Sequence, residues 1–335
     1  ISEKIANVLA LRLTSEEQER MLRRYTESTE AFRLYSLGRF SRIRNQMEAI
    51  EYYQRSLAED SRYALPYVEL ADMYAAMAGN GIAEFRKYGP LAREAANKAL
   101  QLAPELAEAH VAASGYRRVV DRDFPGARKE LEIAMQLNPR SAQVRQARAS
   151  LLAIEGDVPA GIAEARLAME LDPFDGRIAD DLAWLLHCNS QNEESLAWLD
   201  QFARRDRRPQ LPWGRFYALL GLRRFPEAIA SFEDYRKSAT PIRAVNGQLA
   251  CAYALSGDIR RAREVLATLP PDWGFYQRAI VDLAAGDRDA AFANLDRAVE
   301  ERNVFIEWIK ADPSLKPLHG DPRFAAVVKR VGLAP

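Results

Sequence analysis

Three stretches of the chain end in the same way, and their spacing constrains the fold more than any other feature. They cover residues 99–104 (ALQLAP), 134–139 (AMQLNP) and 168–173 (AMELDP), and their closing prolines lie 35 and then 34 residues apart. Because proline cannot continue the hydrogen-bond ladder of a helix, each stretch predicts a helix that ends there. A fixed period of this length predicts an array of helical repeats.

A second set of positions follows the same period. Pro125, Pro159 and Pro226 each precede a small residue by two positions, with spacings of 34 and 67. Proline is well suited to the first turn of a helix, where its missing N–H is not needed. Elsewhere Gly-Asp pairs at 156–157, 257–258 and 286–287 predict turns, with glycine left-handed and aspartate capping the next helix. Thirty-four residues is the period of the tetratricopeptide repeat (TPR), a pair of helices.

The sequence therefore predicts an all-α fold, an α-α superhelix (TPR solenoid) of about eight helix-turn-helix repeats. The repeats are expected to start near Thr29, Ala64, Glu108, Ala142, Gly176, Pro209, Arg243 and Asp272. Small residues recur where paired helices must approach closely; Gly115 and Ala149 mark the slot on first helices and Gly161 the slot on second helices. Glycines at 79 and 81 predict a loop over residues 79–88.

Three segments are expected along the chain. Residues 1–28 form an N-terminal helical segment, residues 29–302 form the array with an irregular joint near 204–212, and residues 303–335 form a C-terminal cap. The cap is expected to end in a helix that starts at Asp321-Pro322 and stops at Gly332. Because the chain opens on Ile1 inside an amphipathic stretch, we expect it to be a piece of a longer protein.

Composition excludes several classes of protein. The 47 basic and 47 acidic residues cancel, so the basic excess of a duplex-binding surface is missing and no nucleic-acid partner is expected for this region. No apolar run approaches the roughly 18–20 residues of a membrane span, so no membrane insertion is expected. Cys188 and Cys251 are the only cysteines; free buried thiols are favoured over a single bridge.

The sequence offers no catalytic constellation. It contains neither a phosphate-binding GxxxxGK[ST] motif nor a dinucleotide-binding glycine pattern. His110, His187 and His319 lie far apart, and none has a second ligand at metal-binding spacing. We therefore predict that the chain is not an enzyme and holds neither a metal nor another cofactor.

Several motifs resemble a bacterial family of multidomain regulators. They are residues 30–39 (EAFRLYSLGR), 107–110 (AEAH), 123–127 (DFPGA) and the closing DPRF at 321–324 with VGL at 331–333. In that family a C-terminal TPR region follows a winged-helix transcriptional-regulator domain, a Ser/Thr kinase domain or a nucleotide cyclase domain. The chain differs from the family at Arg117-Arg118-Val119-Val120, where aromatic residues are usual.

The resemblance implies that first helices line a concave groove, mainly at the fifth and ninth positions of each repeat. Four large aromatic residues and two polar ones stand at such positions: Tyr116, Trp184, Trp213, Tyr217, Gln146 and Asp180. Exposed tryptophan and tyrosine are favoured binding anchors, so one hypothesis is an aromatic groove for a peptide. The alternative is that these rings pack between neighbouring helices.

A basic cluster accompanies the expected joint and comprises Arg204, Arg205, Arg207 and Arg208. It is interpreted either as a solvated connector or as an anionic contact.

These expectations favour a protein-interaction and sensing module, the C-terminal regulatory arm of a bacterial transcriptional regulator or signalling protein in signal transduction. The alternative is a free-standing assembly scaffold or adaptor, and a small-molecule receptor or enzyme is disfavoured. The expected partner is a protein or peptide. The expected location is cytoplasmic, unless a transmembrane segment precedes residue 1. The oligomeric state stays open.

Overall fold

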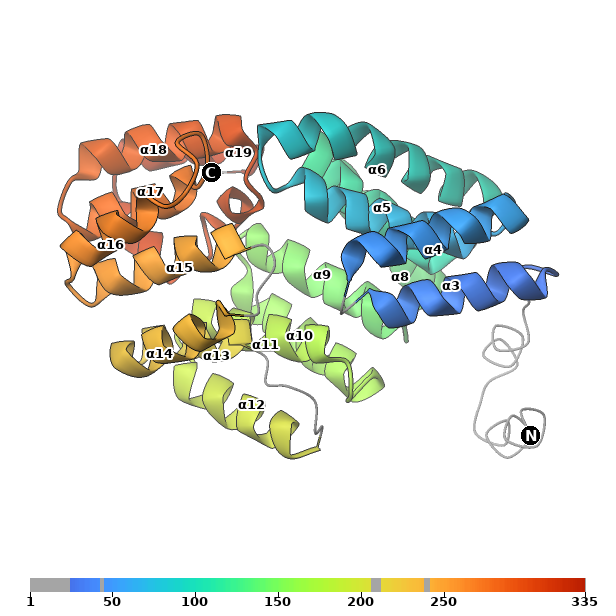
Figure 1. Ribbon diagram of the computed structural model, residues 1–335, viewed down its shortest axis with the longest axis horizontal. Coiled ribbons are helices and arrows are strands. Elements are labelled where there is room, and N and C mark those ends of the chain that lie inside the picture. Colours follow the sequence, from blue (N-terminus) through green and yellow to red (C-terminus); the bar gives the residue numbers. More distant parts are fainter. Residues whose placement is uncertain (1–24, 43–44, 206–211, 238–241, 335) are drawn as a thin grey trace. The chain divides into compact units, whose positions relative to one another are not determined.

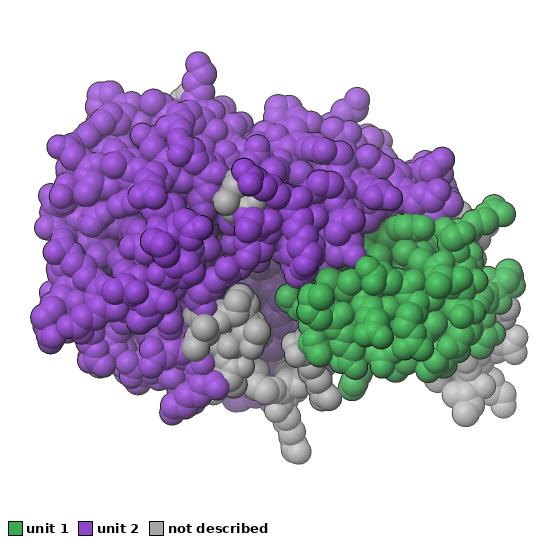
Figure 2. Space-filling view, turned by 45° about the horizontal axis from the view of Figure 1, so that its top comes forward, with its two compact units in different colours: residues 1–70 green, residues 71–335 purple. Residues whose placement is uncertain are grey.

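The computed structural model describes residues 25–42, 45–205, 212–237 and 242–334. In these ranges the regular structure is helical, apart from an isolated bridge between Asn80 and Asn303. The chain divides into two compact units, residues 1–70 and 71–335 (Figure 2). The sequence does not predict a division there. Helix α5 (Ala64–Ala78) runs through the position without a break.

The first unit consists of two helices that pack on each other, α3 (Thr29–Ser41) and α4 (Gln46–Glu59), followed by the start of α5. The Tyr35 ring lies 6.0 Å from that of Tyr53 and 5.3 Å from that of Tyr63, centroid to centroid. A Cβ atom on Gly38 would lie 2.5 Å from the Tyr53 ring. The two helices therefore approach each other through a glycine, as close packing of a helix pair requires.

The second unit continues the array as successive helix pairs (Figure 1). Its helices are α6 (Ile82–Leu102), α7 (Ala107–Tyr116), a π-helical turn η1 (Arg117–Asp121), α8 (Phe124–Leu137), α9 (Ala142–Ile154), α10 (Val158–Leu171), α11 (Gly176–Cys188), α12 (Asn192–Arg205), α13 (Pro212–Gly221), α14 (Phe225–Tyr235), α15 (Ile242–Leu255), α16 (Ile259–Leu266), α17 (Phe275–Ala284) and α18 (Arg288–Glu301). The C-terminal residues form the 3-10 helices η2 (Val304–Trp308) and η3 (Pro313–Leu318), and then α19 (Pro322–Val331).

Several helix ends lie where the sequence predicts them. Pro125, Pro159 and Pro226 stand in the first turns of α8, α10 and α14. The glycines of the three Gly-Asp turns have φ of 106°, 95° and 87°, and the aspartate after each caps the next helix through its side chain. Local turn chemistry thus sets the helix ends, and the all-α prediction of helix-turn-helix repeats is confirmed.

Neighbouring first helices pack on one another, α7 against α9, α9 against α11, and α11 against α13. Within the α9–α10 pair, a Cβ atom on Gly161 would lie 2.7 Å from the carbonyl oxygen of Ala149. This position therefore needs the small residue that the repeat pattern predicts. Gly115 differs, since a Cβ atom there would meet no other atom within 4 Å.

The loop predicted over residues 79–88 is wrong. Helix α6 already begins at Ile82 and continues for 21 residues with Pro90 in its interior. Only the residues around Gly81, whose φ is 128°, are non-helical. The Tyr88 ring stacks on that of Tyr74 at 5.9 Å. This tertiary contact stabilises the helical conformation of a segment whose glycines favour a turn.

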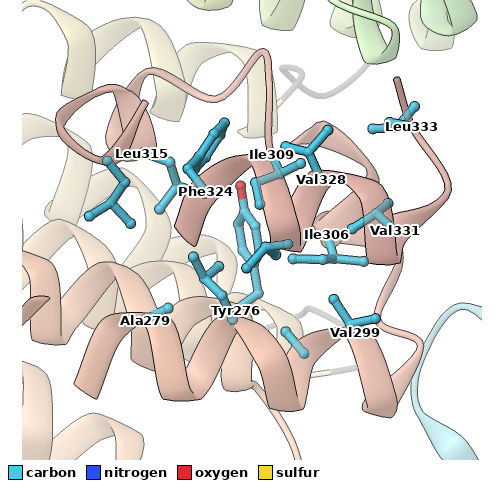
Figure 3. Close-up of a cluster of buried hydrophobic side chains, with 14 of the residues drawn as sticks. Tyr276, Ala279, Val299, Ile306, Ile309, Leu315, Phe324, Val328, Val331 and Leu333 are labelled. Atoms are coloured by element: carbon cyan, nitrogen blue, oxygen red, sulfur yellow. The ribbon is translucent and has the colours of Figure 1, made fainter. Parts of the chain in front are cut away.

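The C-terminal residues do more than cover the last helix pair. Helix α19 packs on α18, and its apolar side chains join those of residues 306–318 in one cluster (Figure 3). Tyr276 of α17 points into that cluster from below, between Ile309 and Phe324 in the view of Figure 3. The described residues of the cap are therefore continuous with the hydrophobic core of the array.

The two ends of the second unit touch each other. The Val304 N–H donates to the Gly79 carbonyl at 2.8 Å, and the Trp273 indole N–H donates to the Asn80 carbonyl at 3.0 Å. Arg243 forms an ion pair with Glu84 at 2.6 Å. These pairs lie about 160 to 225 positions apart, so the helix array of this unit is closed by contacts that the repeat pattern does not predict.

Candidate functional site

Two of the predicted groove residues come together on consecutive first helices. Trp184 of α11 and Tyr217 of α13 have ring centroids 4.4 Å apart. A third ring, that of Trp308 in η2, meets the Trp184 ring edge to face at 5.6 Å. All three side chains are half-buried. We call Trp184, Tyr217 and Trp308 the aromatic cluster.

The other predicted tryptophan lies beside this cluster. The Trp213 centroid is 6.4 Å from that of Tyr217, but its closest ring partner is Phe232 of α14, edge to face at 5.0 Å. Tyr235 is the second partner on that side, at 6.3 Å. Trp213 thus connects the first and second helices of one repeat and stays half-buried.

Tyr116 is not an exposed anchor. It is only 4% exposed, and its hydroxyl donates to the side-chain oxygen of Asn97 in α6 at 3.3 Å. The side chain is therefore packed against α6, directly before the π-helical turn that begins at Arg117. For this residue the alternative of packing between helices is the correct one.

The two predicted polar contacts join neighbouring first helices. The Gln146 side-chain amide donates to the Asp181 carboxylate at 2.6 Å, linking α9 to α11. The Asp180 carboxylate accepts the Gly214 backbone N–H at 2.7 Å, linking α11 to α13. Burial raises the pKa of Asp180 to about 7 and that of Asp181 to about 6. Both carboxyl groups therefore change charge near neutral pH.

The predicted basic cluster is only partly described. Arg204 is exposed at the end of α12, Arg205 belongs to the same helix, and Arg207 and Arg208 lie outside the described residues. Arg204 also borders a cavity of about 630 Å³ between α10, α11 and α12, which sequence reasoning missed. Among the residues that line this cavity, Trp198 stands out because its indole N–H is buried without a hydrogen-bond partner.

Sequence reasoning also missed the role of residues 303–318, which we call the C-terminal segment. Glu307, 3% exposed, forms an ion pair with Arg118 in the π-helical turn. The Lys310 ammonium donates to the Glu155 carbonyl at 2.8 Å at the end of α9. The segment therefore lies against first helices of several repeats.

Asp312 fastens the segment to α17. Its carboxylate accepts the Tyr276 hydroxyl at 2.7 Å and the Ser314 backbone N–H at 2.8 Å. The second bond caps η3, while the first is a long-range contact that only the folded chain brings about. Asp312 thus combines a local role, readable from Asp312-Pro313, with a tertiary one.

A cavity of about 160 Å³ remains between the first helices and the C-terminal segment. The aromatic cluster and Tyr276 form its walls, and Gln248 and Cys251 of α15 lie at its base. Burial raises the pKa of the Cys251 thiol well above its usual range, so this sulfur is protonated and a poor nucleophile.

His187 also borders the cavity and is held neutral. Its Nδ1 atom lies 2.8 Å from the Asn192 side-chain oxygen, and burial lowers the pKa of the imidazole. Among the described residues no three His, Cys, Asp or Glu side chains are placed to hold a metal ion. Both cysteines are free and buried. The arrangement suits binding by ring and hydrogen-bond contacts.

None of the helices in the described part of the chain combines the length and the apolar character needed to cross a membrane.

No protein-family model and no curated protein matches the chain. Among solved structures, a tetratricopeptide repeat protein from Parabacteroides merdae is similar, with 11% identity, a TM-score of 0.47 and coverage of 91% of this chain and 99% of that chain. The Cut9-Hcn1 hetero-tetramer of the APC/C has 16% identity and a TM-score of 0.49, with 98% and 69% covered. Yeast Tom70 has 16% identity and a TM-score of 0.48, with 91% and 68% covered. The chain's own helix pairs and their period of 34 residues are what identify its repeats as tetratricopeptide-type.

Proposed function

We propose that the array is a protein-interaction module that holds an extended or helical segment of a partner on its first helices. The observation that carries the proposal is the C-terminal segment, which lies on that surface with Trp308 against Trp184 and with its Lys310 and Asp312 side chains bonded to the end of α9 and to α17. A surface that accepts one short segment, here built of 3-10 helices, through a tryptophan contact has the chemistry to accept a segment of a partner.

The proposed contact residues are Trp184, Trp213 and Tyr217, with Gln146 and Asp180 as polar neighbours. Half-buried aromatic rings suit this role because they offer much contact area and lose little side-chain entropy on binding. Gln146 and Asp180 keep one hydrogen bond each within the array, to Asp181 and Gly214. Their remaining acceptor and donor capacity is open to a partner's main chain.

Photo-crosslinking of the intact protein in its native host tests this proposal. A photoreactive amino acid is placed at Gln146 on the first-helix surface and, as a matched control, at Lys237, an exposed residue after α14. We expect a discrete adduct with one partner from position 146, lost in Trp184→Ala, and none from position 237. The same adducts from both positions, or none from position 146, would rule the proposed surface out.

We further propose that the array is the regulatory arm of a multidomain regulator of the bacterial family it resembles, and that it works in the cytoplasm. The closing DPRF and VGL motifs support this proposal, together with the entry segment at residues 30–39. The coding sequence upstream of Ile1 provides the test. A winged-helix, kinase or cyclase domain is expected there, whereas a start codon a few residues before Ile1 would favour a free-standing scaffold.

A further inference from the structure

The cavity beside the aromatic cluster has the size of a small organic molecule. Its volume is about 160 Å³, and an apolar protein cavity of roughly 150 Å³ is large enough for benzene. The base, at Gln248 and Cys251, is buried, whereas Trp184, Tyr217 and Trp308 at the rim are half-buried. The cavity therefore has a closed floor and a partly open mouth, and it fits a ligand of roughly seven non-hydrogen atoms.

Five aromatic side chains line the cavity: Trp184, Tyr217, Tyr276, Phe305 and Trp308. The planes of Trp184 and Trp308 meet at 85°, which makes them two adjoining sides of a box. Tyr217 stands beside Trp184, and Tyr276 and Phe305, which also line the cavity, are stacked at 6.2 Å. The faces of such rings carry negative charge density, so a box of them attracts a cation that has lost its water.

A carboxylate lies in the same wall and has no cationic partner. Asp312 is 6% exposed and accepts hydrogen bonds from Tyr276 and Ser314, but no lysine or arginine of the described residues forms an ion pair with it. The Lys310 ammonium bonds instead to carbonyls of residues 155 and 334, and the Lys316 ammonium lies 3.4 Å from the Ser190 hydroxyl. A buried carboxylate without a counter-charge is costly, and a cation in the cavity would supply one.

Two further polar side chains line the cavity. Gln248 is 4% exposed, and Tyr217 is half-buried. The Gln248 amide can both donate and accept a hydrogen bond, as can the Tyr217 hydroxyl. These two groups are therefore suited to contact a polar tail on the ligand.

We propose that this cavity binds a free, small organic cation with a methylated ammonium group, of the size of choline. The rings enclose the ammonium, Asp312 supplies its counter-charge, and Gln248 with Tyr217 contacts a hydroxyl or similar group on the tail. This site goes beyond the binding of a protein partner and does not depend on it. Trp184 and Trp308 line the cavity, and their contact also holds the C-terminal segment against α11. The bound ligand therefore also stabilises that segment.

Calorimetric titration of the intact protein with two probes of equal shape tests the proposal. Choline carries the charge, and 3,3-dimethyl-1-butanol replaces its nitrogen with carbon. We expect choline to bind at least about tenfold more tightly, with quenching of tryptophan fluorescence. Equal binding of the neutral probe would overturn the assignment to a cation, and no saturable binding of either probe would overturn the site. Tighter binding of phosphatidylcholine vesicles than of free choline would overturn the assignment to a free ligand.

Asp312→Asn is the diagnostic variant, since asparagine keeps an acceptor for the Ser314 N–H. Its affinity for choline is expected to fall about tenfold while that for the neutral probe is unchanged. Asp234→Asn, at an exposed carboxylate in the last turn of α14, is the matched control and is expected to bind choline like the wild type. If Asp312→Asn does not fold, Gln248→Leu replaces it; wild-type affinity for choline in whichever of these variants is folded would contradict the proposal.

Discussion

The indole rings of Trp184 and Trp308 meet edge to face, with centroids 5.6 Å apart, although 124 positions separate them in the chain. Trp184 belongs to a first helix in the middle of the array, and Trp308 belongs to the C-terminal segment. Edge-to-face pairs are a favoured ring geometry and add about 0.5–1.5 kcal/mol to the burial of the rings. This pair therefore holds the segment on the surface that we propose for a partner.

Replacing Trp308 by alanine is expected to release the C-terminal segment. The change removes a half-buried indole, and we expect it to lower the free energy of unfolding by about 2–4 kcal/mol. Hydrogen exchange of the amides of residues 303–318 should accelerate. The control is Phe174→Ala, at a side chain that is 57% exposed, with an expected change within about 0.5 kcal/mol. Unchanged exchange in Trp308→Ala would show that the indole does not hold the segment.

The ion pair between Arg118 and Glu307 is expected to be worth far more than the exposed pairs. Glu307 is 3% exposed, and burial lowers the pKa of Arg118 to about 10, which leaves it charged at neutral pH. Arg118→Met strands a buried carboxylate and should cost about 3–5 kcal/mol, measured by denaturant unfolding.

The control for that pair is Lys237 with Asp234, whose side chains are 78% and 80% exposed. Lys237→Met should change the free energy of unfolding by no more than about 0.5 kcal/mol. A double-mutant cycle with Glu307→Gln then isolates the coupling energy of the buried pair. Equal costs for the buried and the exposed pair would contradict the account.

Asp180 makes stability fall as the pH rises. Its folded-state pKa is raised to about 7 by burial, so the folded chain keeps a proton that the unfolded chain has already lost above about pH 4. The stability contribution of that proton is complete at low pH and is lost as the pH passes through 7. Asp180→Asn removes this dependence, and its stability relative to the wild type should improve by about 3 kcal/mol between pH 4.5 and 8. A pH-independent difference between the two proteins would show that burial does not raise this pKa.

Glycine is needed at one repeat position and dispensable at another. Gly161→Ala places a methyl group 2.7 Å from the Ala149 carbonyl oxygen and is expected to destabilise the α9–α10 pair by about 1–3 kcal/mol. Gly115→Ala meets open space inside α7 and should stabilise by about 0.5–1 kcal/mol through helix propensity. Thermal unfolding of the two variants distinguishes the positions. Shifts of the same sign would mean that helix propensity alone governs both.

The elements that the sequence predicts are those that local chemistry determines. Asp157 and Gly156 set a helix boundary by their own hydrogen bond and backbone angle, without reference to the rest of the chain. Trp184 and Tyr217 occupy equivalent positions in consecutive repeats, so the repeat itself brings their rings together. A regular array therefore allows one face of a candidate site to be read from spacing.

The contacts that close the site could not be read in this way. The Arg118–Glu307 pair spans 189 positions, and the bond from Val304 to Gly79 spans more. Both depend on the path that the C-terminal segment takes across the first helices, and no periodic pattern encodes that path. Spacing alone could not decide between an exposed and a buried Tyr116 for a similar reason, because that choice depends on the packing of α6.

The proposed partner surface is tested most directly by the affinity of the crosslinked partner for a double variant, Trp184→Ala with Trp213→Ala. Leu167→Ala with Phe174→Ala, which removes two exposed apolar side chains outside the first helices, serves as the control pair. The account predicts at least about a tenfold loss of affinity for the tryptophan pair and none for the control pair. Unchanged affinity of the tryptophan pair, in protein that remains folded, would contradict it.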